Sequence, residues 1–273
     1  MFSIQKLADL PFYTEGPAID SEGNFYCTTL SGGSILKVDT QGKITEWAKS
    51  VCPNGQIILP DGDHLVCDSK LGVVVRFDAK GQFLKNETPK ILSEVEVFVP
   101  NDLIVDKNGN LYFTDSIRHT GKVCYLGHDG QEAIIADNLD YPNGLIFSHD
   151  EQTLYVAESY KNRILKLNIP KAGKMEGNVA VFANLPTNTE GGYNLPDGLA
   201  LNTNGDIVVA HYGMQAIQML DKHGELLFSI DTTLPLTSNV IFLNETTLLV
   251  TGGYGEPGPG ALFKIELNFT LAF

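Results

Sequence analysis

A pattern that recurs six times along the chain constrains its fold more than any other feature of the sequence. Each copy opens with a side chain that carries an oxygen atom, continues as a short apolar strand, turns at Asp, Asn or Gly, and returns as a second apolar strand. A third strand follows each copy, and most copies then reach a fourth. The copies open at Glu15, Asn54, Asn101, Asn143, Asp197 and Asn239. Four short strands per repeat, at a period of about 40 to 50 residues, are typical of a propeller blade.

The repeats therefore predict an all-β fold, a six-bladed β-propeller of four-stranded blades, with residues 1–273 forming one domain. The sixth copy ends at its third strand, over residues 260–267, whereas the chain begins with a spare strand over residues 2–8. We expect this N-terminal strand to be the outer strand of the last blade, because pairing the two chain ends removes an open seam. The longest insertion between copies, residues 187–194, is a candidate loop at the mouth of the ring.

The acidic balance of the chain narrows the classes of partner. The formal net charge is −14, which disfavours nucleic acid and anionic membranes. The sequence has no apolar run of about 18 residues that could span a membrane, and its first residues lack the apolar core of a secretory signal. We therefore expect a cytoplasmic protein, a monomer or small homo-oligomer, that acts on a small molecule.

The six oxygen-bearing side chains that open the copies should converge at one end of the central axis, because the innermost strand of each blade lies along it. Two carboxylates brought close together are costly to bury unless a cation neutralises them. Oxygen donors favour Ca²⁺, with Mg²⁺, Mn²⁺ or Zn²⁺ as alternatives. In this hypothesis the charge comes from Glu15 and Asp197, the neutral ligands or substrate donors are Asn143 and Asn101, and Asn54 and Asn239 are additional axis residues.

A second set of side chains follows the inner return strands. These residues are Thr28, Asp68, Asp115, Glu158, His211 and Gly252. If the return strands end near the mouth, the set lines the cavity beside the cation. Asp115 is then a candidate catalytic base, and Glu158, His211 and Tyr212 are candidate substrate contacts. The competing interpretation is that an isolated Asp or His at a strand end is a turn or surface residue. Tyrosines in nearby loops either wall a pocket or pack between blades; they are Tyr160, Tyr193, Tyr212 and Tyr254.

At these residues the chain resembles the regucalcin–gluconolactonase family, which also includes luciferin-regenerating enzymes. The matching stretches are residues 15–17, 100–102, 109–115, 142–145, 195–200 and 260–265. The resemblance implies a propeller with one divalent metal in its central channel, held by Glu15, Asn143 and Asp197. It also implies that Asn101 touches substrate or metal and that Asp197 is the general base. The chain departs from sugar-lactone members at Val99, where they often carry Arg, and over residues 116–119.

These features predict a metal-dependent hydrolase that opens a small lactone, with Asp197 or Asp115 as the base that activates water. One alternative is hydrolysis of another electrophile in the same cage, such as a phosphotriester or a luciferin-like thiazoline ring. A second alternative is a metal-binding regulatory propeller without catalysis. A serine hydrolase is disfavoured because the sequence has no Gly-x-Ser-x-Gly motif, and a dinucleotide fold is disfavoured because the glycines at 253–258 fall in a late β repeat.

Overall fold

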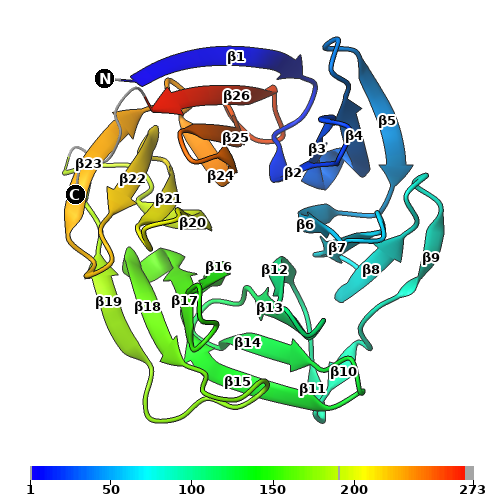
Figure 1. Cartoon of the computed structure of the whole chain (residues 1–273), viewed down its shortest axis with the longest axis vertical. Coiled ribbons are helices and arrows are strands. Elements are labelled where there is room, and N and C mark those ends of the chain that lie inside the picture. The colour runs from blue at the N-terminus through cyan, green and yellow to red at the C-terminus, as the bar shows by residue number, and fades with distance from the viewer. Residues whose placement is uncertain (1, 190, 268–273) are drawn as a thin grey trace.

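The first five blades of the ring each pair four strands in chain order, from the axis outward (Figure 1). The structure is a computed structural model that describes residues 2–189 and 191–267. Blade one contains β2 (Glu15–Ile19), β3 (Phe25–Thr28), β4 (Ser34–Val38) and β5 (Ile44–Lys49). Blade two contains β6 (Pro53–Ile58), β7 (His64–Asp68), β8 (Val73–Phe77) and β9 (Phe83–Asn86). Blade three contains β12 (Pro100–Val105), β13 (Leu111–Asp115), β14 (Gly121–Leu126) and β15 (Glu132–Leu139).

The remaining blades complete the ring. Blade four contains β16 (Pro142–Phe147), β17 (Thr153–Glu158), β18 (Arg163–Asn168) and β19 (Ala180–Asn184). Blade five contains β20 (Leu195–Leu201), β21 (Ile207–Tyr212), β22 (Ala216–Leu220) and β23 (Leu226–Asp231). Blade six contains β24 (Leu236–Asn244), β25 (Thr247–Gly253), β26 (Gly260–Leu267) and β1 (Phe2–Leu10). The predicted six-bladed propeller of four-stranded blades is therefore confirmed.

Blade six joins the two ends of the chain. Strand β1 runs antiparallel to β26, from the pair Phe2 and Leu267 to the pair Leu10 and Gly260, with a register shift between Lys6 and Ala8. In Figure 1 the blue β1 lies along the outside of the red β26. The predicted closure is confirmed, and it gives the backbone groups on the outer side of β26 a partner.

The inner hairpins of blades one, two, three and five turn where the sequence places Asp or Asn ahead of Gly. At the turn of blade three, the Asp106 carboxylate accepts hydrogen bonds from the backbone N–H groups of Asn108 and Asn110, both at 2.9 Å. Gly109 adopts a left-handed backbone conformation there, with φ of 83°, which side chains disfavour. This turn chemistry returns the chain antiparallel to itself, so each repeat becomes a sheet.

The apolar core lies between neighbouring blades. One cluster joins Val208 and Met219 of blade five to Val250 and Phe263 of blade six. A second cluster joins blades three and four in the same way. Burial of apolar surface stabilises the ring by about 25 cal/mol for each Å². Because these side chains point sideways into the interfaces, the inner strand ends remain free to carry polar groups.

Short elements complete the described part of the chain. They are the hairpin of β10 (Ile91–Leu92) with β11 (Val95–Glu96) and the 3₁₀ turns η1 (Leu30–Gly32) and η2 (Ser159–Lys161). Across residues 2–189 and 191–267, neither 3₁₀ turn nor any other helical segment has the length and apolar character needed to cross a bilayer.

Candidate active site

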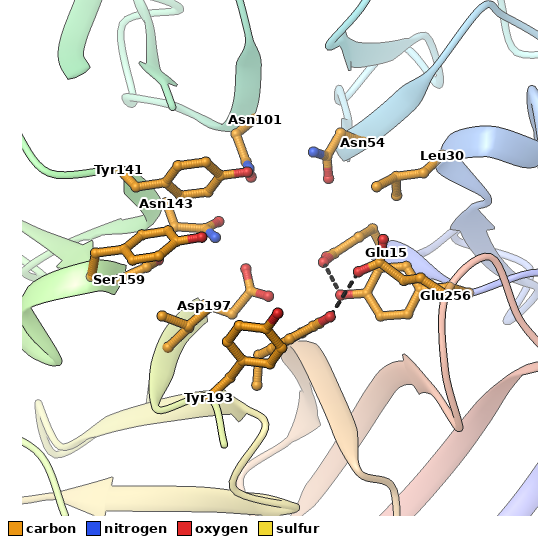
Figure 2. A pocket seen from close by; sticks show the side chains of 14 residues that line it. Glu15, Leu30, Asn54, Asn101, Tyr141, Asn143, Ser159, Tyr193, Asp197 and Glu256 are labelled. Carbon is orange, nitrogen blue, oxygen red and sulfur yellow. Dashed lines mark hydrogen bonds between the residues drawn. The ribbon is translucent and has the colours of Figure 1, made fainter. Parts of the chain in front are cut away.

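A cavity of about 410 Å³ lies where the inner strands converge on the axis (Figure 2). Its lining contains five of the six side chains that open the repeats, which are Glu15, Asn54, Asn101, Asn143 and Asp197. The other residues that line it are Tyr13, Leu30, Tyr141, Ser159, Tyr160, Tyr193, Leu195, Tyr212 and Glu256. In Figure 2 the side chains of Glu15, Asn143 and Asp197 point toward one another from different sides of the cavity.

A β-bulge at the start of the inner strand aims the axial side chains of blades two to five, whereas Glu15 of blade one itself pairs with Thr28, just ahead of the bulge. In blade two, Pro53 pairs with Asp68 and the next pair is Gln56 with Val66, so one strand has an extra residue at Asn54. Such a bulge twists the strand and redirects a side chain. The same shift occurs after Pro100 in β12, Pro142 in β16 and Pro196 in β20. Proline fits the position before the bulge because it donates no hydrogen bond to the ladder.

Blade six keeps this pairing register but carries its Asn one residue later than the other blades. Thr237 pairs with Gly252, and Val240 pairs with Val250. The residue in the bulge position that Asn54 holds is therefore Ser238, and Asn239 lies one residue further along the strand. This explains why Asn239, which the sequence places on the axis, is not among the residues that line the cavity.

Asn239 belongs instead to a deeper layer, together with Asp102. The Asn239 amide Nδ2 lies 3.4 Å from Asp102 Oδ2. Other blades have glycine at this level, and a Cβ atom on Gly55 or Gly198 would collide with Asp102 or Asn239, respectively. Burial raises the pKa of the Asp102 carboxyl to about 6. The sequence analysis missed Asp102, although Asn101-Asp102 in place of Asn-Gly was a visible departure from the repeat.

Two buried carboxylates dominate the electrostatics of the cavity. Burial raises the pKa of Glu15, and the nearby Asp102 adds to this effect, whereas a hydrogen bond from Tyr13 opposes it. Burial raises the pKa of Asp197 well above its usual value, and the charge of Glu15 raises it further. The Tyr13 hydroxyl donates to Glu15 Oε1 at 2.9 Å. The described lining contains no Lys, Arg or His that could neutralise these carboxylates.

The donor set fits a hard divalent cation. Among residues 2–189 and 191–267, no group of three or more His, Cys, Asp or Glu side chains is arranged to hold a metal. A metal in this cavity would therefore take amide oxygen in addition to the Glu15 and Asp197 carboxylates, and Asn143 hydrogen-bonds to Asp197. Carboxylate and amide oxygens suit Ca²⁺ and Mg²⁺. A cation there would relieve the unfavourable burial that raises both pKa values.

The second set of predicted side chains faces the protein rather than the cavity. Asp115 is fully buried, and its Oδ1 accepts the backbone N–H groups of Phe98 and Val99 at 3.1 and 2.7 Å. Its Oδ2 lies 3.3 Å from Nζ of Lys122. Asp68 accepts hydrogen bonds from Val51 N–H and Cys52 N–H in the same way. These carboxylates hold the segment that enters their own blade, because buried N–H groups require an acceptor.

Glu158 and His211 have similar internal contacts. Glu158 accepts the backbone N–H of Asp140 at 2.8 Å and lies 2.6 Å from Nε of Arg163. His211 Nε2 is 2.9 Å from the side-chain oxygen of Asn162, and burial lowers the pKa of His211 to about 4. Neither residue lines the cavity. The sequence analysis expected both to contact the substrate, whereas here both side chains face neighbouring segments of the protein. Tyr212 does line it.

Tyrosines form much of the cavity wall. Tyr212 lies between Tyr13 and Tyr193, with ring centroids 6.1 and 5.9 Å away and edge-to-face geometry. Tyr193 comes from the predicted mouth loop at 187–194, of which residue 190 lies outside the described residues. Tyr160 also lines the cavity, whereas Tyr254 is not among the lining residues.

Glu256 is a further cavity residue that the sequence analysis missed. It lies in the connection between β25 and β26, outside the repeated pattern. The Tyr212 hydroxyl donates to Glu256 Oε1 at 2.8 Å. An acidic residue in a glycine- and proline-rich loop gives no sequence signal for this placement.

A family model for the SMP-30/Gluconolactonase/LRE-like region matches residues 13–253. The chain belongs to this family. Lactonase drp35 of Staphylococcus saprophyticus is 30% identical over 227 residues, which cover 77% of this chain and 67% of the relative. A gluconolactonase of Xanthomonas campestris is 26% identical, with a TM-score of 0.83 over 97% of this chain and 89% of that structure. Regucalcin of Agrobacterium tumefaciens, described as a calcium-binding protein, shares the fold at 19% identity, with a TM-score of 0.80 over 97% and 94%.

Proposed function

We propose that this chain is a divalent-metal-dependent lactonase that hydrolyses a small lactone in the axial cavity. The observation that carries the proposal is the pair of buried carboxylates, Glu15 and Asp197, whose pKa values are raised inside a cavity without a basic side chain. The family and the lactonase and gluconolactonase relatives support hydrolysis of a lactone as the reaction.

Glu15, Asn143 and Asp197 would hold the cation through oxygen atoms, with Ca²⁺ as the first candidate. A divalent cation bound there supplies Lewis-acid polarisation of the substrate carbonyl and stabilises the negative charge that develops on its oxygen. Tyr13 fixes the orientation of Glu15 through its hydrogen bond to Oε1. Asn101 and Asn54 reach the cavity from neighbouring blades and can donate amide N–H groups to the substrate.

Asp197 is assigned as the general base. Its carboxylate lines the cavity, where it can accept a proton from a water molecule next to the substrate. It takes a proton from water as the water oxygen attacks the lactone carbonyl carbon. The bond between that carbon and the ring oxygen then breaks, and Asp197 returns the proton to the ring oxygen, giving a hydroxy acid. Asp115 is assigned a positioning role, because its oxygens already accept hydrogen bonds from Phe98 and Val99 and contact Lys122.

The deciding experiment measures turnover of a panel of γ- and δ-lactones by protein stripped with a chelator and then reloaded with Ca²⁺, Mg²⁺, Mn²⁺ or Zn²⁺. We expect activity that is lost on stripping and restored by at least one cation, and a kcat lowered by about 10³-fold in the Asp197→Asn variant. Metal content measured on both proteins separates loss of the base from loss of the cation. Absence of turnover on every lactone with every cation would overturn the proposal. A phosphotriester panel tests the same cavity for the alternative electrophile.

A further inference from the structure

A third carboxylate reaches the cavity at its rim. Glu256 lies in the loop between β25 and β26 and is exposed to solvent, whereas Glu15 and Asp197 are buried at the inner strands. Figure 2 shows the Glu256 side chain entering the cavity from the side of Glu15. The cavity therefore carries carboxylates both at its floor and at its rim. A substrate that enters from the rim meets negative charge at both levels.

The hydrogen-bonding partner of Glu256 leaves its charge in place. Tyr212 donates one hydrogen bond to Oε1 at 2.8 Å, and Glu256 forms no ion pair with the described Lys, Arg or His side chains. A divalent cation would balance the two charges of Glu15 and Asp197. The negative charge of Glu256 would then still have no positive partner, in a chain whose net charge is already −14.

The tyrosines beside Glu256 complete a surface for positive charge. Tyr212 is in direct contact with Glu256, and its ring meets those of Tyr13 and Tyr193 edge to face. Electron-rich ring faces attract ammonium groups, and a carboxylate next to them adds direct charge attraction. Anionic substrates meet repulsion at the same place, since no basic side chain is among the described lining residues.

We propose that Glu256 is a specificity-determining residue, which together with the tyrosine wall selects lactones that carry a cationic group and rejects anionic lactones. This inference rests on the proposed lactonase function and names the substrate class of that cavity. In this arrangement the lactone ring lies toward Asp197 and the cationic substituent lies at the rim, against the hydrogen-bonded pair of Glu256 and Tyr212.

The test compares three γ-butyrolactones that carry a trimethylammonium, a tert-butyl or a carboxylate substituent at the same ring position. The first two have nearly the same shape and differ in charge. We expect wild-type kcat/KM to be about fivefold higher for the trimethylammonium lactone than for the tert-butyl lactone, as for a partly exposed charge pair, and lowest for the carboxylate. In Glu256→Gln the first two rates become equal and the carboxylate lactone improves. A wild-type protein without preference for the cation overturns the inference.

Two variants separate charge from other effects of the substitution. Tyr212→Phe removes the hydrogen bond to Glu256 but keeps the carboxylate, so it retains a preference for the cation; complete loss there would overturn the assignment to the Glu256 charge. Glu245→Gln removes an exposed carboxylate from the β24–β25 turn and leaves the ratio of rates unchanged.

A binding measurement keeps this inference distinct from the proposed reaction. The corresponding lactams resist hydrolysis, and calorimetry on the cation-loaded protein gives their affinities. Tighter binding of the trimethylammonium lactam that disappears in Glu256→Gln supports the inference even if no lactone is turned over. Lactone turnover with the same substrate preference in wild type and Glu256→Gln overturns it and leaves the lactonase function standing.

Discussion

Two sets of polar side chains lie near the same end of the propeller axis, and they have opposite effects on the stability of the fold. The cavity set, represented by Glu15 and Asp197, opens the inner strands, and the strand-end set, represented by Asp68 and Asp115, ends the return strands. Both sets are buried. They differ in the groups that their oxygens face. The oxygens of the cavity set face other cavity side chains, whereas those of the strand-end set face backbone N–H groups.

The pKa directions show the physical consequence. Burial opposes the charge of Asp68, but hydrogen bonds from the Ser50 hydroxyl and from backbone N–H groups lower its pKa below the usual value. Burial together with the charge of Glu15 raises the pKa of Asp197 well above it. A buried carboxylate surrounded by donors supports the fold, whereas one surrounded by other acids is costly to the fold and available for a cation or a proton.

The largest expected effect comes from removing the charge of Asp197. Asp197→Asn should lower kcat by about 10³-fold, the loss typical of a general base, without loss of thermal stability in the metal-free protein, because one of two repelling carboxylates is gone. Steady-state kinetics and thermal melts check both parts. Activity within about tenfold of wild type would remove the distinction between the two sets.

The next effect concerns pH and the metal-free protein. A carboxyl whose pKa is raised on folding binds its proton more tightly in the folded state, so its contribution to stability is present at low pH and is lost as pH rises. Stripped wild type should therefore lose stability relative to Glu15→Gln between pH 5 and 8, by more than about 1 kcal/mol. Urea unfolding at both pH values measures this difference. A saturating cation should reduce it, and a constant difference across the range would contradict the assignment.

A smaller effect is expected in the strand-end set, and it falls on stability rather than chemistry. Asp115→Asn weakens the acceptor of two backbone N–H groups and removes the partner charge of Lys122, which should cost about 1–3 kcal/mol of unfolding free energy. At a temperature where the variant is folded, kcat should stay within about threefold of wild type. Asp68→Asn is the matched variant in blade two. A loss of activity in Asp115→Asn comparable to that in Asp197→Asn would return Asp115 to the catalytic candidates.

The smallest effect tests the displaced residue of blade six. Asn239→Ala removes hydrogen bonds to Asp102 and Glu15 and should cost about 1 kcal/mol of stability. It should lower kcat/KM by less than about threefold, because Asn239 is not among the lining residues that can meet the substrate. Asn143→Ala removes the same chemical group from the cavity lining and should lower kcat/KM by more than about tenfold. Equal losses in the two variants would show that the one-residue displacement of Asn239 has no functional meaning.

The fold was predictable because each blade is a local unit whose strands and turns are encoded within one repeat. The same repeat placed Glu15, Asn143 and Asp197 at the axis. It could not place Asn239, because residue types alone do not show that Ser238, rather than Asn239, pairs in the register of Asn54. Nor could it separate Asp115 from Asp197, since the difference lies in backbone N–H groups contributed by a segment outside the motif. Glu256 lies in a loop that no repeat describes.

The pairing of β1 with β26 makes completion of the ring depend on the far end of the chain. Strand β1 leaves the ribosome early, but its partner is synthesised only after five other blades. Until then the growing protein is an open arc with an unpaired edge at each side, a form exposed to proteases and to association with other chains. A message truncated before β26 therefore yields a product whose β1 has no partner, so its ring cannot close.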